Sequence, residues 1–113
     1  MEKIIKRYKK LKEFIMQERD KTLAENTPEK TQHLAPDFVQ SRIDKAENRC
    51  REKLNNLRIN CKIDLLASKA ESINTQKRNN NEWRGWLQED QDKMKAFEEN
   101  VVSKVLAEIF ANP

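Results

Sequence analysis

The chain has 113 residues and a formal net charge of +4; 37% of its residues are charged and 36% are hydrophobic, with one glycine and three prolines. A chain of this length forms one domain at most, and it is long enough for a modest core. Its low content of glycine and proline argues against sheets and tight turns. Low hydrophobicity with high charge is also typical of disorder, but here the charges nearly cancel and the apolar residues form stripes. We expect one all-α domain over residues 1–113, with three helices and a long central helix, as an elongated helical bundle or a coiled-coil-like assembly.

The first predicted helix covers residues 2–25. Its apolar residues recur at spacings of four and three, the period of one helix face, and they are Ile4, Tyr8, Leu11 and Ile15. Residues 26–35 are predicted to be a linker, because the residue before a proline favours an extended or turn conformation. Pro36, at the end of this linker, suits the first position of the next helix.

The long central helix is predicted over residues 36–75, because no glycine or proline occurs between Pro36 and Gly85. Within it, residues 57–65 alternate strictly between apolar and polar, which is also the pattern of a half-buried strand. A strand would need a partner strand and turn residues at its ends, and the sequence offers neither. Two apolar stripes on opposite sides of one helix produce the same alternation. We therefore predict a helix that changes its buried face midway, from the stripe of Val39, Ile43, Cys50, Leu57 and Cys61 to the stripe of Ile59, Ile63, Leu66, Ala70 and Ile73.

Residues 76–81 are predicted to be a turn, because they include three consecutive asparagines, which are poor helix formers and good caps. Asn81 is expected to cap the start of the third helix, predicted over residues 82–111. The apolar stripe of this helix widens after Val101, as if its last turns were buried on more than one side. Helices of such unequal length leave part of the central helix uncovered, so either that helix bends or another chain packs on the remainder.

Residues on these stripes are the candidates for a protein interface. Both tryptophans flank the only glycine in EWRGW (residues 82–86), where they are either core anchors or an exposed hot spot for a partner. The wide C-terminal stripe is either a dimer seam or a face that binds another protein's helix. The candidate interface residues are Val39, Ile43, Cys50, Leu57, Cys61, Trp83, Trp86, Val102, Leu106, Ile109 and Phe110.

Two groups of basic residues are candidates for contacts with nucleic acid or with acidic partners. The first lies in the run KIIKRYKKLK (residues 3–12), a basic amphipathic segment that suits phosphates or a membrane surface, although most such runs are solvated faces of bundle helices. The second flanks the first apolar stripe, where coiled coils often pair such residues with acids of another helix. The acidic residues 82–113, with four Lys/Arg against seven Asp/Glu, are a candidate source of those acids. The candidate residues are Lys3, Lys6, Lys9, Lys10, Arg42, Lys45, Arg49 and Lys53.

The residue types that carry most enzyme and metal chemistry are scarce. Cys50 and Cys61 would lie roughly 16 Å apart on one helix, too far for a disulfide between them, and only His33 could join them, short of the four ligands of a zinc site. We interpret both as buried apolar residues, with an interchain disulfide as the alternative. His33 has no partner for a catalytic triad, and a single glycine leaves no phosphate-binding loop. We expect no enzyme activity, no cofactor and no metal.

The sequence therefore favours a non-enzymatic protein–protein interaction module: an adaptor, assembly subunit or small chaperone that acts as a dimer or in a hetero-complex. The alternative is a nucleic-acid-binding or regulatory protein that uses the basic helix surfaces. No apolar run approaches the roughly 20 residues of a membrane span, and charges interrupt the first segment where a signal peptide needs an apolar stretch. We expect an intracellular, cytoplasmic protein with no transmembrane segment and no membrane-surface contact.

Overall fold

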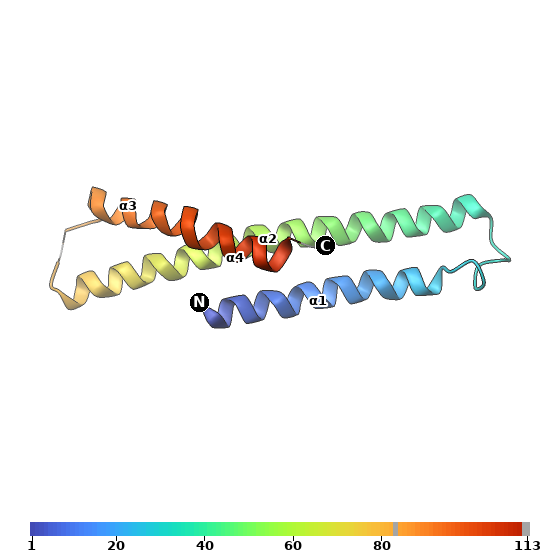
Figure 1. The fold of residues 1–113 in the computed structure, drawn as a ribbon, viewed down its shortest axis with the longest axis horizontal. Coiled ribbons are helices and arrows are strands. Elements are labelled where there is room, and N and C mark those ends of the chain that lie inside the picture. The colour runs from blue at the N-terminus through green and yellow to red at the C-terminus, as the bar shows by residue number, and fades with distance from the viewer. Residues whose placement is uncertain (83, 112–113) are drawn as a thin grey trace. The chain divides into compact units, whose positions relative to one another are not determined.

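The computed structural model describes residues 1–82 and 84–111. The helices in these ranges are α1 (Glu2–Glu25), α2 (Pro36–Asn79), α3 (Gln88–Phe97), the π-helix η1 (Glu98–Val102) and α4 (Ser103–Phe110). Because α3, η1 and α4 follow one another without a break, they form one continuous third helix (Figure 1). Of the residues that the structure describes, 83% are helical and none is in a strand, which confirms the predicted all-α fold with a long central helix.

The stretch with the ambiguous pattern, residues 57–65, lies inside α2 and is helical throughout. The predicted change of buried face is wrong in this stretch. Cys61 and Leu65 are 0% and 1% exposed, whereas Ile59 and Ile63 remain 47% and 56% exposed. Residues four apart lie on one helix face, so the buried seam of α2 continues from Cys61 through Leu65 and leaves the two isoleucines on the solvent side.

The chain is divided into two compact units, where the sequence led us to expect a single domain. Unit 1 contains residues 1–8 and 58–113, and unit 2 contains residues 9–57. Both long helices contribute to both units. Helix α1 passes from unit 1 into unit 2 after Tyr8, and α2 passes from unit 2 into unit 1 after Leu57.

Unit 2 is an antiparallel pair formed by the greater part of α1 and the first half of α2 (Figure 1). Residues 26–35, the segment predicted as a linker, join the two helices. Local hydrogen bonds fold this segment back: the Thr31 hydroxyl and backbone N–H both donate to the Thr27 carbonyl oxygen, at 2.8 and 3.1 Å. Pro36 then begins α2 at a position where its missing N–H leaves no helix hydrogen bond unmade.

The core of unit 1 forms where α3, η1 and α4 lie along the second half of α2 (Figure 1). Both sides contribute apolar residues to it: Leu65 and Ile73 come from α2, and Val102, Val105 and Ile109 come from η1 and α4. Full burial of such side chains contributes about 1.5–3 kcal/mol each, so this small set supplies most of the apolar stabilisation of the unit.

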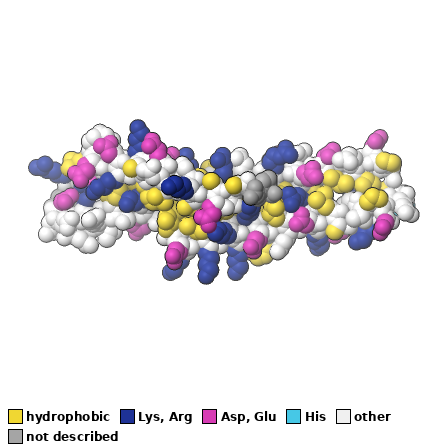
Figure 2. Space-filling model, in the orientation of Figure 1, with side chains coloured by type: hydrophobic (Ala, Val, Ile, Leu, Met, Phe, Trp, Pro, Cys, Tyr) yellow, Lys and Arg dark blue, Asp and Glu magenta, His cyan; other side chains and the backbone are white. Residues whose placement is uncertain are grey.

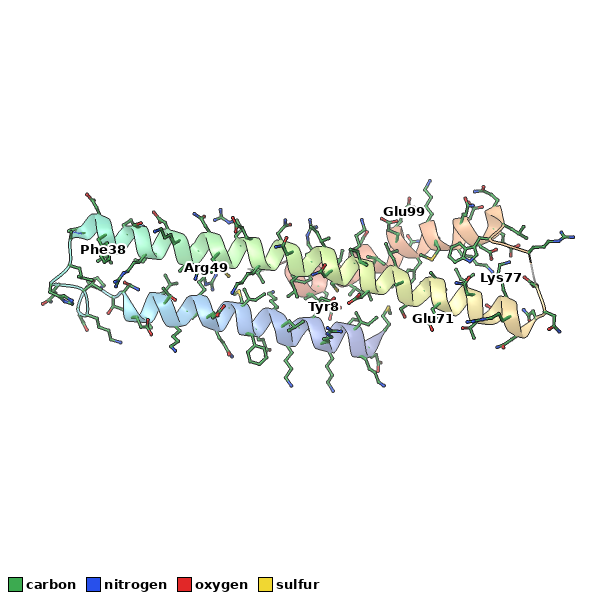
Figure 3. All side chains as sticks on the ribbon, turned by 180° about the vertical axis from the view of Figure 1, so that it is seen from behind. Tyr8, Phe38, Arg49, Glu71, Lys77 and Glu99 are labelled. Atoms are coloured by element: carbon green, nitrogen blue, oxygen red, sulfur yellow. The ribbon has the colours of Figure 1, made fainter. Side chains whose placement is uncertain are left out.

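A buried tyrosine ties the start of α1 into the same unit. Tyr8 is 4% exposed and points from α1 toward α2 (Figure 3), where its hydroxyl donates a hydrogen bond to the Asp64 carboxylate. Burial, followed by the hydrogen bond to Asp64, raises the pKa of Tyr8 to about 12. The hydroxyl therefore stays protonated and remains a donor across the physiological pH range.

The π-helix η1 was not foreseen from the sequence. The Ser103 N–H bonds to the Glu98 carbonyl oxygen five residues earlier, and the Ser103 hydroxyl donates to the same oxygen at 3.1 Å. One π turn inserts an extra residue into an α-helix, which rotates the following helix surface by roughly 100°. Val102, Val105 and Ile109 are buried as a result, and the apparent widening of the stripe after Val101 reflects this rotation.

The expected turn at residues 76–81 and the expected helix over residues 82–111 are displaced in the structure: α2 continues to Asn79 and α3 begins only at Gln88. Asn81 does not cap the next helix. It has a φ of 57°, the left-handed conformation that commonly ends a helix. The Asn81 N–H bonds to the Arg78 carbonyl at 3.1 Å and the Glu82 N–H to the Lys77 carbonyl at 2.9 Å, which is a Schellman motif.

A buried ion pair connects the end of α2 with the start of α3. Asp90 accepts a hydrogen bond from the Leu87 backbone N–H at 2.9 Å and contacts the Lys77 ammonium at 2.8 Å. Both charged side chains are largely buried, and Lys77 points from α2 toward α3 (Figure 3). The hydrogen bond between them raises the pKa of Lys77 and lowers the pKa of Asp90. Lys77 also donates a hydrogen bond to Glu82 Oε2 at 3.3 Å, so two carboxylates pair its charge beside the core.

We expect Asn81→Val to destabilise unit 1 by about 1–2 kcal/mol, because a side chain at positive φ is strained, and Asn81→Gly to be neutral or stabilising. Urea unfolding followed by circular dichroism measures both. Asn80→Val is the matched control, since Asn80 is exposed and does not have a positive φ. Equal losses from Asn80→Val and Asn81→Val would contradict a role for the left-handed turn.

The Lys77–Asp90 pair should make unit 1 sensitive to acid. A carboxyl whose pKa is lowered by folding stabilises the fold above its unfolded pKa of about 3.9 and loses this effect as the pH falls through the folded value. The raised pKa of Lys77 acts below about 10.4, and its effect is lost as the pH rises through the folded value. Both contributions are therefore complete at neutral pH.

Asp90→Asn should accordingly lower the melting temperature at neutral pH, and its difference from the wild type should shrink below a pH of about 4. Thermal melts across this range measure the effect. Glu89→Gln, an exposed carboxylate one residue earlier, is the control and should change the profile little. A parallel offset at every pH would contradict the assignment.

Candidate functional site

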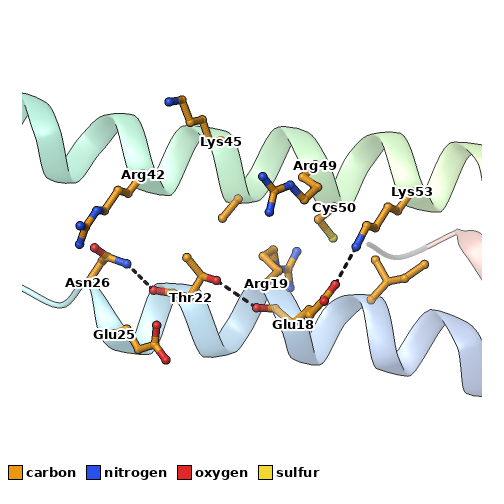
Figure 4. Close-up of a pocket in the computed structure, with 12 residues that line it drawn as sticks. Glu18, Arg19, Thr22, Glu25, Asn26, Arg42, Lys45, Arg49, Cys50 and Lys53 are labelled. Atoms are coloured by element: carbon orange, nitrogen blue, oxygen red, sulfur yellow. Dashed lines mark hydrogen bonds and ion pairs between the residues drawn. The ribbon is translucent and has the colours of Figure 1, made fainter.

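A groove with a basic lining lies between α1 and α2 in unit 2, and we call it the basic groove (Figure 4). It has a volume of about 500 Å³. Both helices present charged side chains along it, with carboxylates on α1 and cations mostly on α2. The lining residues are Ile15, Glu18, Arg19, Thr22, Glu25, Asn26, Arg42, Lys45, Ala46, Arg49, Cys50 and Lys53.

The second basic group predicted from the sequence is brought together in this groove. All four of its members line it, and Arg19 of α1 adds a fifth cation. Their predicted partners were acids of residues 82–113, but Lys53 pairs instead with Glu18 of α1, at 2.9 Å. The hydrogen bond from Lys53, together with the nearby charge of Arg49, lowers the pKa of Glu18. This pair lies within unit 2, where Glu18 is on the antiparallel neighbour of α2.

The cations of the basic groove differ in how they are held. Lys53 is engaged by Glu18, and Arg42 lies over the Phe38 ring at 4.5 Å, within the range of a cation–π contact. Among the residues that the structure describes, Lys45 and Arg49 form neither a hydrogen bond nor an ion pair. In Figure 4 the Lys45 side chain extends away from α1. Arg49 acts on Glu18 only through its nearby charge, so a ligand in the groove can bind it without breaking a hydrogen bond.

Asn26 lines the basic groove directly after the end of α1, and the sequence analysis did not identify it as a candidate. It is 6% exposed, and its Nδ2 donates to the Thr22 carbonyl oxygen at 2.7 Å. Its Oδ1 is buried without a hydrogen-bond partner. In Figure 4 the side chain extends from the end of α1 toward Arg42. An asparagine just after a helix is a common terminating residue, so nothing in the sequence marks this one as unusual.

A second groove, which we call the apolar groove, lies in unit 1 along α2, η1 and α4 and has a volume of about 570 Å³. Its floor is formed by apolar side chains, and Ile59 of α2 is 47% exposed at its edge. Lys62 and Glu98 form an ion pair of 3.0 Å across it. The lining residues are Arg58, Ile59, Lys62, Glu98, Val102, Ser103, Leu106, Ala107, Phe110 and Ala111.

The predicted interface residues fall into three groups. Cys50, Cys61, Val102 and Ile109 are buried, and Val102 also lines the apolar groove. Leu106 and Phe110 line the same groove and are half-buried. The third group is half-buried outside the apolar groove and consists of Val39, Ile43, Leu57 and Trp86. Trp83 lies outside the described residues. The structure therefore brings Val102, Leu106 and Phe110 together along the apolar groove.

Trp86 is held by a hydrogen bond from its indole Nε1 to the Asn74 Oδ1 of α2, at 2.5 Å. This contact supports the interpretation of Trp86 as an anchor of the chain between α2 and α3. Trp86 lies outside both grooves.

The lysines of the first basic group, Lys3, Lys6, Lys9 and Lys10, are exposed on α1. On the face shown in Figure 2, Lys and Arg side chains lie among Asp and Glu side chains, and several of them project side by side along the lower edge. Exposure of this kind is typical of a solvated helix surface, and the contacts of these lysines stay a prediction.

Both cysteines are free and buried. Burial, followed by the charge of Asp64, raises the pKa of the Cys61 thiol to about 11. A thiol with such a pKa is protonated at neutral pH and is a poor nucleophile and metal ligand. The described residues hold no cluster of three or more His, Cys, Asp or Glu side chains that fits a metal ion. None of the described helices combines the length and the apolar character needed to cross a bilayer.

The buried state of Cys61 can be tested by alkylation. In the folded protein Cys61 should react with iodoacetamide far more slowly than it does in urea, because the thiolate is scarce and water is excluded. Peptide mass spectrometry after timed quenching measures the rate. Rapid modification of Cys61 without denaturant, or a disulfide-linked dimer through this residue, would contradict the burial.

Comparison of the chain with protein-family models, with curated proteins and with solved structures finds no match.

Proposed function

We propose that this protein is a helical protein–protein interaction module, an adaptor, assembly subunit or small chaperone that acts as a dimer or in a hetero-complex. The observation that carries this proposal is the apolar groove of unit 1 with an exposed isoleucine at its edge. We infer that the groove receives the apolar face of a helix from another polypeptide, either a second copy of the chain or a different protein.

The composition of the apolar groove supports a helix as its occupant. The groove runs between α2 and the helix formed by η1 and α4, and side chains of Val102, Leu106 and Phe110 recur along it at a spacing of four. Grooves between two helices commonly bind an amphipathic helix through anchors at spacings of three and four.

Charged side chains that line the apolar groove would favour one orientation of a partner helix. The Lys62–Glu98 pair is exposed at 47% and 45%, so it is a weak surface interaction that a partner can replace. Arg58 lines the same groove, and a partner helix with an acidic flank on that side would complement it.

The nucleic-acid alternative has less support. The lining of the basic groove contains no aromatic side chain on which a base can stack. The basic run of residues 3–12 is followed on α1 by the acidic residues Glu13, Glu18 and Asp20, whereas a nucleic-acid surface concentrates basic charge along one face.

Ile59→Asp should abolish assembly without unfolding the protein, because Ile59 is already half exposed and a carboxylate there would have to be desolvated by the partner helix. Leu106→Asp should have the same effect on assembly. Light scattering during size exclusion measures the solution mass against the 13.4 kDa of one chain. Phe14→Asp is the matched control, because Phe14 is 60% exposed on unit 2 and lies outside the apolar groove.

If the wild type exceeds one chain in mass, the proposal requires Ile59→Asp to return it to a monomer and Phe14→Asp to leave it unchanged. If the wild type is a monomer, a photo-cross-linking residue at position 59 should capture a defined protein from cell extract that Leu106→Asp abolishes, and the same residue at position 14 should not. Unchanged mass in Ile59→Asp, or equal capture at both positions, would refute the assignment to this groove.

A further inference from the structure

The basic groove of unit 2 combines two features that point to a ligand. Its lining holds five Lys and Arg residues against two Glu, an excess of three positive charges. It also holds a buried amide oxygen, Asn26 Oδ1, without a hydrogen-bond partner. A buried polar atom left unpaired costs about 1–3 kcal/mol, so a molecule that pairs it gains an interaction that the protein alone does not make.

The geometry around Asn26 explains why the protein does not satisfy this oxygen itself. The Nδ2 of the same amide donates to the Thr22 carbonyl oxygen at 2.7 Å, which fixes the amide orientation. Arg42, the cation toward which Asn26 extends, is placed over the Phe38 ring. The unpaired acceptor therefore needs a donor from outside, such as a hydroxyl group.

The basic side chains of the groove indicate that the ligand also carries negative charge. Lys45 and Arg49 line the groove without a hydrogen bond or ion pair among the described residues, one turn apart on α2. In Figure 4 Arg49 lies between the two helices, whereas Lys45 extends away from α1. A guanidinium group in the position of Arg49 binds phosphate oxygens through charge-assisted hydrogen bonds. The volume of about 500 Å³ lies in the range of small-molecule sites. No aromatic residue lines the groove, so it offers nothing for a base to stack on.

We propose that the basic groove binds a small phosphorylated polyol, a compact polyanion that also carries free hydroxyl groups. A phosphate lies against Arg49, and a hydroxyl donates to Asn26 Oδ1. The same chemistry occurs in soluble polyol phosphates and in the headgroups of phosphorylated lipids. The site lies in unit 2 and is independent of the apolar groove in unit 1.

Titration calorimetry of the full chain with inositol tetrakisphosphate tests the phosphate contacts. Arg49→Gln should weaken binding at least tenfold, the loss of one charge-assisted contact of about 1.4 kcal/mol. Arg51→Gln is the matched control: it removes the same charge two residues away on α2, is exposed, and lies outside the groove. It should weaken binding less than twofold. Absence of binding to the wild type, or equal losses in both variants, would overturn the proposal.

Asn26→Ala tests the hydroxyl contact, with circular dichroism to confirm that the helices remain. It should weaken binding of inositol tetrakisphosphate, which has free hydroxyls, by at least threefold. Binding of inositol hexakisphosphate, which has none, should be unchanged. Equal losses for both ligands would overturn the assignment of a polyol.

The source of the ligand is distinguished by a second measurement. Co-sedimentation with phosphatidylcholine vesicles that contain phosphatidylinositol bisphosphate is compared with vesicles that contain the same total charge as phosphatidylserine. Binding to the first alone identifies a lipid headgroup; binding to neither, with calorimetric binding retained, identifies a soluble ligand. Equal binding to both, or tighter binding of single-stranded oligothymidine than of inositol tetrakisphosphate, would overturn the proposal by indicating attraction to any polyanion.

Discussion

One helix supplies packing surface to both compact units, and this constraint governs the rest of the fold. Helix α2 contains 44 residues and is so rich in charge that only a narrow seam of it is buried. An isolated helix gains most of its stability in proteins from packing on neighbours. The seam is formed largely by small or medium side chains, from Cys50 through Cys61 and Leu65 to Ile73, which lets neighbouring helices approach closely. Every other described helix lies along part of it (Figure 1).

Because the apolar seam is narrow, polar contacts locate the neighbouring helices. In unit 1, the Tyr8–Asp64 hydrogen bond positions the first turns of α1, and the Lys77–Asp90 ion pair positions the start of α3. In unit 2, the Lys53–Glu18 pair links the two antiparallel helices at the surface, where such a contact contributes little to stability. Buried polar groups that are fully paired specify one arrangement among several of similar apolar burial. The unpaired Asn26 oxygen is the exception, and it lies in the basic groove, whose lining has an excess of three positive charges.

Much of the secondary structure could be predicted from residue pattern alone. The helix over residues 57–65 followed from the absence of turn residues and of a partner strand, both local properties. The buried side of that helix could not be predicted, because Ile59 and Ile63 are as apolar as Cys61 and Leu65, and only the position of the neighbouring helices decides which pair is covered. The basic residues of α2 were recognisable at helical spacing, but Asn26 acquires its character from burial, which no pattern encodes. The function of Asn81 was misjudged because asparagine suits both the start and the end of a helix.

The single π turn η1 makes the chemistry of the apolar groove depend on chain length as much as on side-chain type. A chain with one residue fewer between Glu98 and Val102 would close this segment as an ordinary α-helix. Every residue of α4 would then be turned by roughly 100°, so that Leu106 and Phe110 would leave the groove without any change in their identity. In a fold of this kind, the insertion or deletion of a single residue at the π turn changes which side chains form the binding surface. Related chains that differ only at this turn would share their composition, yet they would bury a different side of α4 and present different faces to their partners.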